Sequence, residues 1–175
     1  MQGLKIIYTG NGKGKTTAAI GAAVRAAGQG LRVKIIQFIK ADNLKFGEHK
    51  LIEQIPNIEI KSFGKGFIGI LGDKTTEKEH KLAADKALKE LEKALKSKEC
   101  NMVIADEILG AIYANLIDEN KIITLIESCS CNKHFILTGR NASDKLISLV
   151  DTVTEMKEIK HHYQNKIASQ KGIEY

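Results

Sequence analysis

The sequence predicts an α/β fold in which helices cover both faces of a mostly parallel sheet, with residues 1–175 forming a single domain. Three observations support this prediction: short apolar runs recur along the chain, helical patterns separate them, and a glycine-rich loop joins the first run to the first helix. The runs have the length and composition of strands that are buried on both faces. They cover residues 4–8, 33–39, 58–63, 102–105, 135–138 and 152–156.

Two helices carry clear end signals, the first and the longest. The first begins where the glycine-rich loop ends and is expected to stop near Gly28-Gln29-Gly30, because glycine commonly follows the last turn of a helix. The longest is expected to start at Thr75-Thr76, where Thr76 and Glu79 have the spacing of a capping box. The leucines predicted to form its core-facing stripe are Leu82, Leu88, Leu91 and Leu95.

The loop at residues 9–17, TGNGKGKTT, has the pattern of a phosphate cradle. Gly10, Gly12 and Gly14 let successive backbone N–H groups point at phosphate oxygens, and the helix N-terminus adds partial positive charge. Lys15 supplies a mobile positive charge for the outer phosphates, and the hydroxyl of Thr16 is placed to bind Mg²⁺. The residues predicted to hold the nucleotide are Gly10, Asn11, Gly12, Lys13, Gly14, Lys15, Thr16 and Thr17.

The loop departs from the usual pattern at one position. That pattern, G-x-x-x-x-G-K-[ST], begins with glycine, and Thr9 stands in its place. The alternative interpretation is a surface turn rich in lysine and glycine. A strand before the loop and a helix after it favour the cradle.

Two other predicted strands run into charged residues. Asp106 and Glu107 follow the strand at 102–105, and Arg140 follows the strand at 135–138. Because ligands of parallel α/β sheets bind at the carboxyl ends of strands, these side chains are expected to face the phosphate cradle. Asp106 would bind Mg²⁺ directly or through water, Glu107 would bind the metal or position a nucleophile, and Arg140 would contact phosphates. The alternatives are a helix N-terminal charge effect for the acids and a surface turn for Arg140.

The formal net charge of +6 is interpreted as a lysine-rich solvated surface and not as a nucleic-acid-binding one, and anionic small molecules stay open as ligands. Most of the positive charge is lysine interleaved with glutamate, and aromatic residues form only 5% of the chain, too few for stacking on bases. The chain shows neither a signal-peptide pattern nor an apolar run of membrane-spanning length. We therefore expect no nucleic-acid partner and no membrane.

Cysteine and histidine show the spacing of neither a disulfide framework nor a zinc site. The cysteines are too few and odd in number, so we expect them to be reduced, in the cytoplasm. They are Cys100, Cys129 and Cys131. The histidines are interpreted as structural or exposed. They are His49, His80, His134, His161 and His162.

One segment interrupts the alternation of strands and helices. Residues 62–73, SFGKGFIGILGD, combine four glycines with five apolar side chains. A loop this apolar either packs under another part of the protein or is available to a ligand.

Several segments together resemble one family, the P-loop ATP:cob(I)alamin (corrinoid) adenosyltransferases. The phosphate loop is shared with many ATPases, whereas a Gly-x-Gly-Phe segment, a Thr-Gly-Arg strand end and the C-terminal pattern are more particular to the family. The resemblance covers nearly the whole chain, and the segments occur in the family's order. They are residues 9–17, 37–40 (QFIK), 64–67 (GKGF), 106–107 (DE), 138–140 (TGR) and the end of the chain, Lys160-His161…Lys166…Gln170…Gly172-Ile173-Glu174-Tyr175.

This resemblance implies a three-layer, RecA-like fold of the P-loop NTPase type and a homodimer. It implies transfer of the 5′-deoxyadenosyl group of ATP to Co(I) of cobalamin or another corrinoid, with inorganic triphosphate as the leaving group. Lys15, the loop backbone, and Mg²⁺ on Thr16 and Glu107 with Asp106 nearby would stabilise charge on the triphosphate. Arg140 matches a family position near the active site, and the expected electron donor is a protein such as a reduced flavoprotein.

The resemblance also implies a role for Phe67 at cobalt. In the family this phenylalanine helps to displace the lower axial ligand of Co(II), which leaves four-coordinate cobalt that cellular reductants can convert to Co(I). The family commonly has tryptophan two residues later, where this chain has Gly69. Either Ile68, Ile70 or Leu71 fills that space, or corrinoid handling differs.

Two other functions stay open on the residues alone. A P-loop ATPase or small-molecule kinase would share Lys15, Thr16 and Asp106 but would release ADP. A non-catalytic carrier of nucleotide or corrinoid would bind its ligands without turnover. The products formed from ATP and reduced cobalamin distinguish these alternatives from adenosyl transfer.

Overall fold

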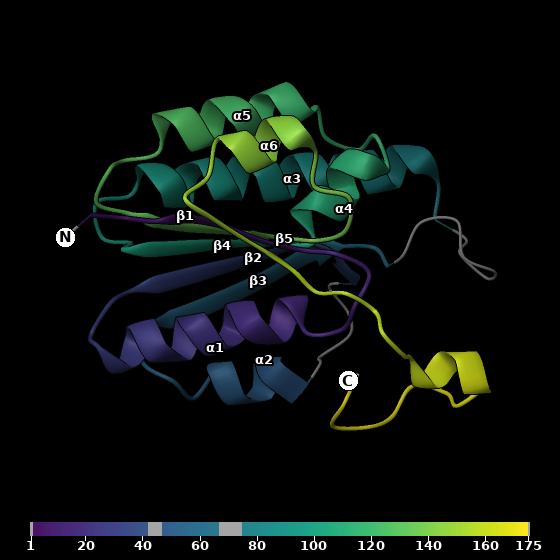
Figure 1. The fold of residues 1–175 in the computed structure, drawn as a ribbon. Helices are drawn as coiled ribbons and strands as arrows, with labels where there is room; N and C mark the ends of the chain where they lie inside the picture. Colours follow the sequence, from purple (N-terminus) through teal and green to yellow (C-terminus); the bar gives the residue numbers. More distant parts are fainter. Residues whose placement is uncertain (1, 42–46, 67–74, 175) are drawn as a thin grey trace.

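A computed structural model describes residues 2–41, 47–66 and 75–174. Within them the chain forms a six-stranded sheet in the order β3-β2-β4-β5-β1-β6, and all neighbouring strands run parallel (Figure 1). The strands are β1 (Lys5–Thr9), β2 (Val33–Ala41), β3 (Ile58–Gly64), β4 (Met102–Asp106), β5 (His134–Thr138) and β6 (Thr152–Glu155). Each predicted strand is confirmed, with ends that differ by no more than two residues.

Helices lie on both faces of this sheet, which confirms the predicted three-layer α/β arrangement (Figure 1). One face is covered by α1 (Lys15–Gly28) and α2 (Gly47–Ile52). The other is covered by α3 (Glu77–Lys96), α4 (Ile108–Tyr113), α5 (Glu119–Ser128) and α6 (Asp144–Ser148). A 3₁₀-helix, η1 (His162–Asn165), lies in the C-terminal segment after β6. In the described ranges we find no helix that combines the length and the apolar character needed to cross a membrane.

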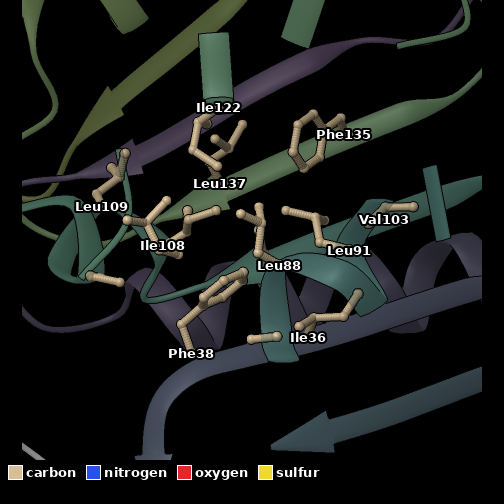
Figure 2. Packing of buried hydrophobic residues seen from close by; sticks show 14 of the residues in the cluster. Ile36, Phe38, Leu88, Leu91, Val103, Ile108, Leu109, Ile122, Phe135 and Leu137 are labelled. Carbon is tan, nitrogen blue, oxygen red and sulfur yellow. The ribbon is translucent and has the colours of Figure 1, made fainter. Parts of the chain in front are cut away.

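Strand β4 shows why the central strands are apolar along their whole length. Successive side chains of a strand point to opposite faces, and both faces of this sheet are buried. Val103 and Ala105 join the cluster beneath α3 to α6, whereas Met102 and Ile104 join the cluster beneath α1 and α2. Figure 2 shows the first cluster, where Leu91 of α3 points toward side chains from the sheet.

The ends of the two marked helices follow the sequence signals. Thr76 is the N-cap of α3: its hydroxyl accepts from the backbone N–H of Glu79 at 3.3 Å, and the Glu79 carboxylate accepts from the backbone N–H of Thr76 at 2.8 Å. This is the predicted capping box. Helix α1 ends at Gly28, also as predicted.

The predicted leucine stripe of α3 is wrong at its first member. Leu82 is 57% exposed, whereas Leu88, Leu91 and Leu95 are buried. Six positions along a helix correspond to a rotation of about 240° beyond one full turn, so Leu82 and Leu88 lie on different faces. Ala84, four positions before Leu88, is fully buried and occupies the place that the stripe assigned to Leu82.

Candidate active site

The carboxyl ends of β1, β4 and β5 meet at one edge of the sheet, because β5 lies between the other two and all three run parallel. The phosphate loop, the Asp106-Glu107 pair and Arg140 follow these strand ends, as expected for a ligand site. A pocket of about 500 Å³ lies there. It is lined by the predicted residues Lys13, Gly14, Lys15, Thr16, Thr17 and Glu107, together with Ile20, Lys40, Gly47, Glu48, Gly172, Ile173 and Glu174.

The shape of the loop depends on glycine at two kinds of position. Gly10 and Gly14 have φ of 97° and 112°, in the left-handed region that side chains disfavour. Gly12 instead needs its small size, because a Cβ there would lie 2.5 Å from the backbone oxygen of Met156. The backbone N–H of Gly12 donates to that same oxygen at 2.6 Å. The loop is therefore seated against the chain that follows β6.

Thr9, which replaces the first glycine of the usual pattern, is a buried anchor. Its hydroxyl accepts from the backbone N–H of Ala142 at 3.3 Å, and its carbonyl accepts from the backbone N–H of Met156 at 2.8 Å. A glycine could not make the first of these bonds. The departure thus ties the start of the loop to the segment between β5 and α6.

Lys15 is buried at the first position of α1, with 7% of its surface exposed. Its ammonium donates to the carbonyl oxygens of Gly10 at 2.8 Å and Gly12 at 2.7 Å. Burial lowers the pKa of Lys15, and the positive charge of Arg140 adds to this, while Glu107 acts against it. The loop thus holds a desolvated cation, which interacts strongly with a phosphate because little water screens it.

Asp106 is the centre of a hydrogen-bond cluster and is 1% exposed. Its Oδ1 accepts from the hydroxyls of Thr16 at 2.9 Å and Thr138 at 2.7 Å. Its Oδ2 accepts from the side-chain amide of Gln37 at 3.0 Å, and the ammonium of Lys40 lies 3.6 Å from the same oxygen. The carboxylate therefore joins the start of α1 to β2 and β5.

Glu107 has an unusual backbone and an unfavourable environment for its charge. Its φ of 60° is in the left-handed region, and such outliers concentrate at functional sites. Its backbone N–H donates to the Thr138 hydroxyl at 2.9 Å. Burial raises the pKa of Glu107, and the neighbouring Asp106 charge raises it further, against the opposing effect of Lys15. A cation in the pocket would relieve this unfavourable charge.

The donor set at this edge fits Mg²⁺. Thr16, Asp106 and Glu107 offer hard oxygen atoms, and the Thr16 hydroxyl gives its hydrogen to Asp106, which leaves its lone pairs for a cation. Among the described residues no group of three or more His, Cys, Asp or Glu side chains could form a protein-only metal cage. Mg²⁺ with nucleotides commonly uses one or two protein ligands and completes its shell with phosphate and water.

The remaining predicted site residues are exposed or lie outside the described residues. Arg140 is exposed and follows Gly139, and its charge acts on both Lys15 and Glu107. Asn11 is exposed on the loop. Phe67 and the three apolar residues proposed to fill the space at Gly69 lie outside the described residues.

Four polar residues of the site were given no role from the sequence, although three of them lie in segments that carry the family resemblance: Gln37, Lys40, Glu48 and Glu174. Lys40 contacts Glu48 at 2.9 Å beside the pocket, and Lys13 pairs with Glu174 at 2.7 Å, which brings the C-terminal segment to the loop. Gln37 is fully buried next to Asp106. Two signals were available for Gln37: its place in the family segment 37–40, and its position inside an otherwise apolar strand run, where a glutamine needs a buried partner.

The cysteines and histidines are placed as follows. Cys100 and Cys129 are buried, Cys131 is exposed, and all three are free thiols. His49 and His80 are buried, and the rings of His161 and His162 stack with their centroids 4.4 Å apart.

The fold defines the class of the protein, an α/β protein of the P-loop NTPase type. A sequence profile described as ATP:corrinoid adenosyltransferase BtuR/CobO/CobP matches residues 1–175. The chain belongs to this family. Its activity is adenosyl transfer to a corrinoid, with ATP as the co-substrate that the family description names.

Relatives of known name support the assignment. The chain is 31% identical over 176 residues to a corrinoid adenosyltransferase of Pseudomonas aeruginosa, with 99% of this chain and 84% of the relative covered. It is 33% identical over 175 residues to the corrinoid adenosyltransferase CobA of Salmonella typhimurium, with 99% and 86% covered. A corrinoid adenosyltransferase from Sinorhizobium is 34% identical over 177 residues, with 99% and 81% covered.

A solved structure is similar in fold alone. It is a chain containing ATPases 2 and 3 of EssC from Geobacillus thermodenitrificans, with a TM-score of 0.50 and 15% sequence identity. The match covers 97% of this chain but only 35% of that chain, so this protein corresponds to about a third of it.

Proposed function

We propose that the loop binds the triphosphate of ATP as a leaving group while C5′ of the nucleotide is attacked by the Co(I) centre of cobalamin or another corrinoid. The electron pair of Co(I) forms the Co–C5′ bond, the C5′–O bond breaks, and its electron pair leaves with inorganic triphosphate. Cobalt is formally oxidised to Co(III). The observation that carries this proposal is that Lys15, Thr16 and Glu107 line one pocket at the phosphate loop, with the buried Asp106 hydrogen-bonded behind Thr16.

The chain's own groups would stabilise the departing charge. Lys15, already desolvated against Gly10 and Gly12, would move its ammonium from their carbonyls to phosphate oxygens. The backbone N–H groups of Asn11, Lys13, Gly14 and Lys15 and the N-terminus of α1 would add further positive potential, whereas the N–H of Gly12 is already donated to Met156 O. Thr16 and Asp106, with Glu107 in the same pocket, would hold Mg²⁺, which would supply more positive charge on the triphosphate side.

Arg140 would act on the same charge from β5. Its guanidinium is exposed at the strand end, and its field reaches Lys15 and Glu107 in the pocket. An exposed arginine beside a pocket of this charge can turn toward a phosphate and bind it with two N–H groups.

The corrinoid side of the reaction rests on the family resemblance. We propose that Phe67 excludes the lower axial ligand of Co(II), and that a reduced flavoprotein or similar donor supplies the electron that gives Co(I). We also propose that the chain folds as a single domain, that two copies form a homodimer, and that the protein is located in the cytoplasm. Three free cysteines support that reducing location.

Product analysis tests the proposal. The protein is incubated with ATP, Mg²⁺ and cob(II)alamin under a reductant strong enough to generate cob(I)alamin. We expect adenosylcobalamin and inorganic triphosphate in equal amounts. Release of ADP and phosphate without adenosylcobalamin would indicate an ATPase or kinase, and binding of both ligands without product would indicate a carrier. Either result would overturn the proposed chemistry.

A further inference from the structure

A chain of buried polar groups leads from Asp106 to the far edge of the sheet. At its centre is Gln37 on β2, which is 0% exposed and has apolar neighbours in sequence. Its Nε2 donates to Asp106 Oδ2 at 3.0 Å. Its Oε1 accepts from the Ser62 hydroxyl on β3 at 2.7 Å and lies 2.8 Å from Nε2 of His49 on α2. The three elements β2, β3 and α2 therefore meet at one amide group.

These contacts fix the direction of the Gln37 amide. Asp106 already accepts from two hydroxyls, so it requires a donor from Gln37, and Ser62 donates to the carbonyl end. Because the carbonyl oxygen can only accept, His49 Nε2 must carry its hydrogen and donate as well. Reversal of the amide would place its oxygen against the Asp106 carboxylate, and such a buried mismatch costs about 1–3 kcal/mol.

The amide completes the support of the Asp106 carboxylate. Thr16 and Thr138 hold Oδ1, and Gln37 holds Oδ2. With both oxygens held from different elements, the carboxylate plane has one orientation, and that orientation determines where the Thr16 hydroxyl points its lone pairs.

We propose that Gln37, held by His49 and Ser62, is a positioning residue that orients Asp106 and Thr16 for the divalent cation bound with ATP. The inference rests on the proposed function in taking Mg·ATP as the ligand. It also links the metal side of the pocket to α2 and to the end of β3, which no site residue predicted from the sequence does.

The first test measures binding, not turnover. In Gln37→Met, which has similar volume but no hydrogen-bonding group, we expect the Mg²⁺ concentration for half-maximal ATP binding to rise at least about fivefold, equivalent to about 1 kcal/mol. ATP affinity in EDTA should change less than about twofold. A merely structural defect would weaken binding equally with and without Mg²⁺, and that result, or an unchanged Mg²⁺ requirement, would overturn the proposal.

A milder variant guards against misfolding. Ser62→Ala removes one of the two donors to Gln37 on a half-buried side chain, and we expect a shift of about twofold in the same direction. Its matched control is Ser128→Ala on α5, where the lost hydroxyl donates to Thr124 O at 2.7 Å far from the pocket, and no shift is expected. If Gln37→Met does not fold, an unchanged Mg²⁺ requirement in Ser62→Ala overturns the proposal.

The two proposals can fail separately. Wild-type protein that needs Mg²⁺ to bind ATP but forms no adenosylcobalamin would refute the proposed chemistry and leave Gln37 testable by binding. Wild-type protein that forms adenosylcobalamin while Gln37→Met keeps a normal Mg²⁺ requirement would refute the positioning role alone. ATP binding by wild-type protein that is indifferent to Mg²⁺ would also overturn the positioning role.

Discussion

Lys15 and Lys133 are buried to nearly the same extent but lie at opposite ends of the parallel strands. Lys15 is 7% exposed and follows β1 at its carboxyl end, whereas Lys133 is 5% exposed and precedes β5 at its amino end. Each ammonium donates to two backbone carbonyls. Burial lowers the pKa of both side chains. By burial, pairing and pKa direction the two lysines are hard to distinguish.

Their partners separate them. Lys133 donates to Ala94 O at 3.0 Å and Ser97 O at 2.6 Å, and these carbonyls belong to the C-terminal end of α3. The last carbonyls of a helix lack partners within it, so Lys133 is a helix cap that also complements the helix dipole. Lys15 faces a pocket in which a phosphate can replace its carbonyl partners. A buried lysine indicates a binding site only where its partners can be exchanged.

The largest expected effect is at Lys15. In Lys15→Met we expect kcat/KM for adenosylcobalamin formation to fall roughly 10²–10³-fold, because the variant loses the desolvated ammonium that would stabilise the triphosphate leaving group. The measurement is the absorbance change of the cobalamin at saturating corrinoid. A fall of less than about tenfold in folded protein would mean that the two lysines do not differ in the way their partners suggest.

A smaller effect is expected at Lys133, and it falls on stability and not on activity. Lys133→Met leaves the buried carbonyl of Ala94 without its side-chain donor, while Ser97 O keeps the backbone N–H of Cys100 at 3.4 Å, and the loss should lower the free energy of unfolding by about 1–3 kcal/mol. The Tm should fall by about 2–4 °C for each kcal/mol, while kcat/KM of the folded fraction stays within about twofold of wild type. A variant that keeps its Tm but loses activity would contradict the capping role.

The smallest effect extends the comparison to a buried acid. Because the pKa of Glu107 is raised in the folded state, that state binds more protons than the unfolded one between the unfolded value of 4.5 and the raised value. The free energy of unfolding should therefore fall as pH rises through this window. Glu107→Gln should remove this part of the pH dependence and raise the Tm at neutral pH by about 2 °C or more.

Melting curves from pH 4 to pH 8, without ATP or divalent cations, measure this effect. Glu127→Gln, an exposed glutamate on α5, is the matched control and should follow the wild-type profile. If Glu107→Gln also follows it, the raised pKa is not part of the folding equilibrium.

The layers and the phosphate edge of the fold could be predicted because their signals are local. Strands buried on both faces are apolar throughout, and a glycine-rich turn before Lys15 has few other uses. The strand-end rule then placed Asp106, Glu107 and Arg140 at the same edge. Leu82 was misassigned because the count of leucines took precedence over their exact angular spacing.

The rest of the site depends on contacts between distant segments, which spacing along the chain does not encode. Gln37 reads as a lone polar residue until His49, Ser62 and Asp106 are brought to it by three elements. The pairing of Lys13 with Glu174 joins residues at opposite ends of the chain. The family segments 37–40 and 172–175 contain Gln37 and Glu174, but neither segment indicates which residues they contact.

Seating of the loop on Met156 bears on how the protein is made. The backbone N–H of Gly12 donates to Met156 O, the backbone N–H of Met156 donates to Thr9 O, and β6 pairs with β1. The first strand and its loop therefore contact residues that are synthesised more than a hundred positions later. A nascent chain cannot complete these contacts of the loop until that late segment has left the ribosome. Until then Thr9 and Gly12 lack their hydrogen bonds to Met156, and the loop lacks the backbone against which it is seated.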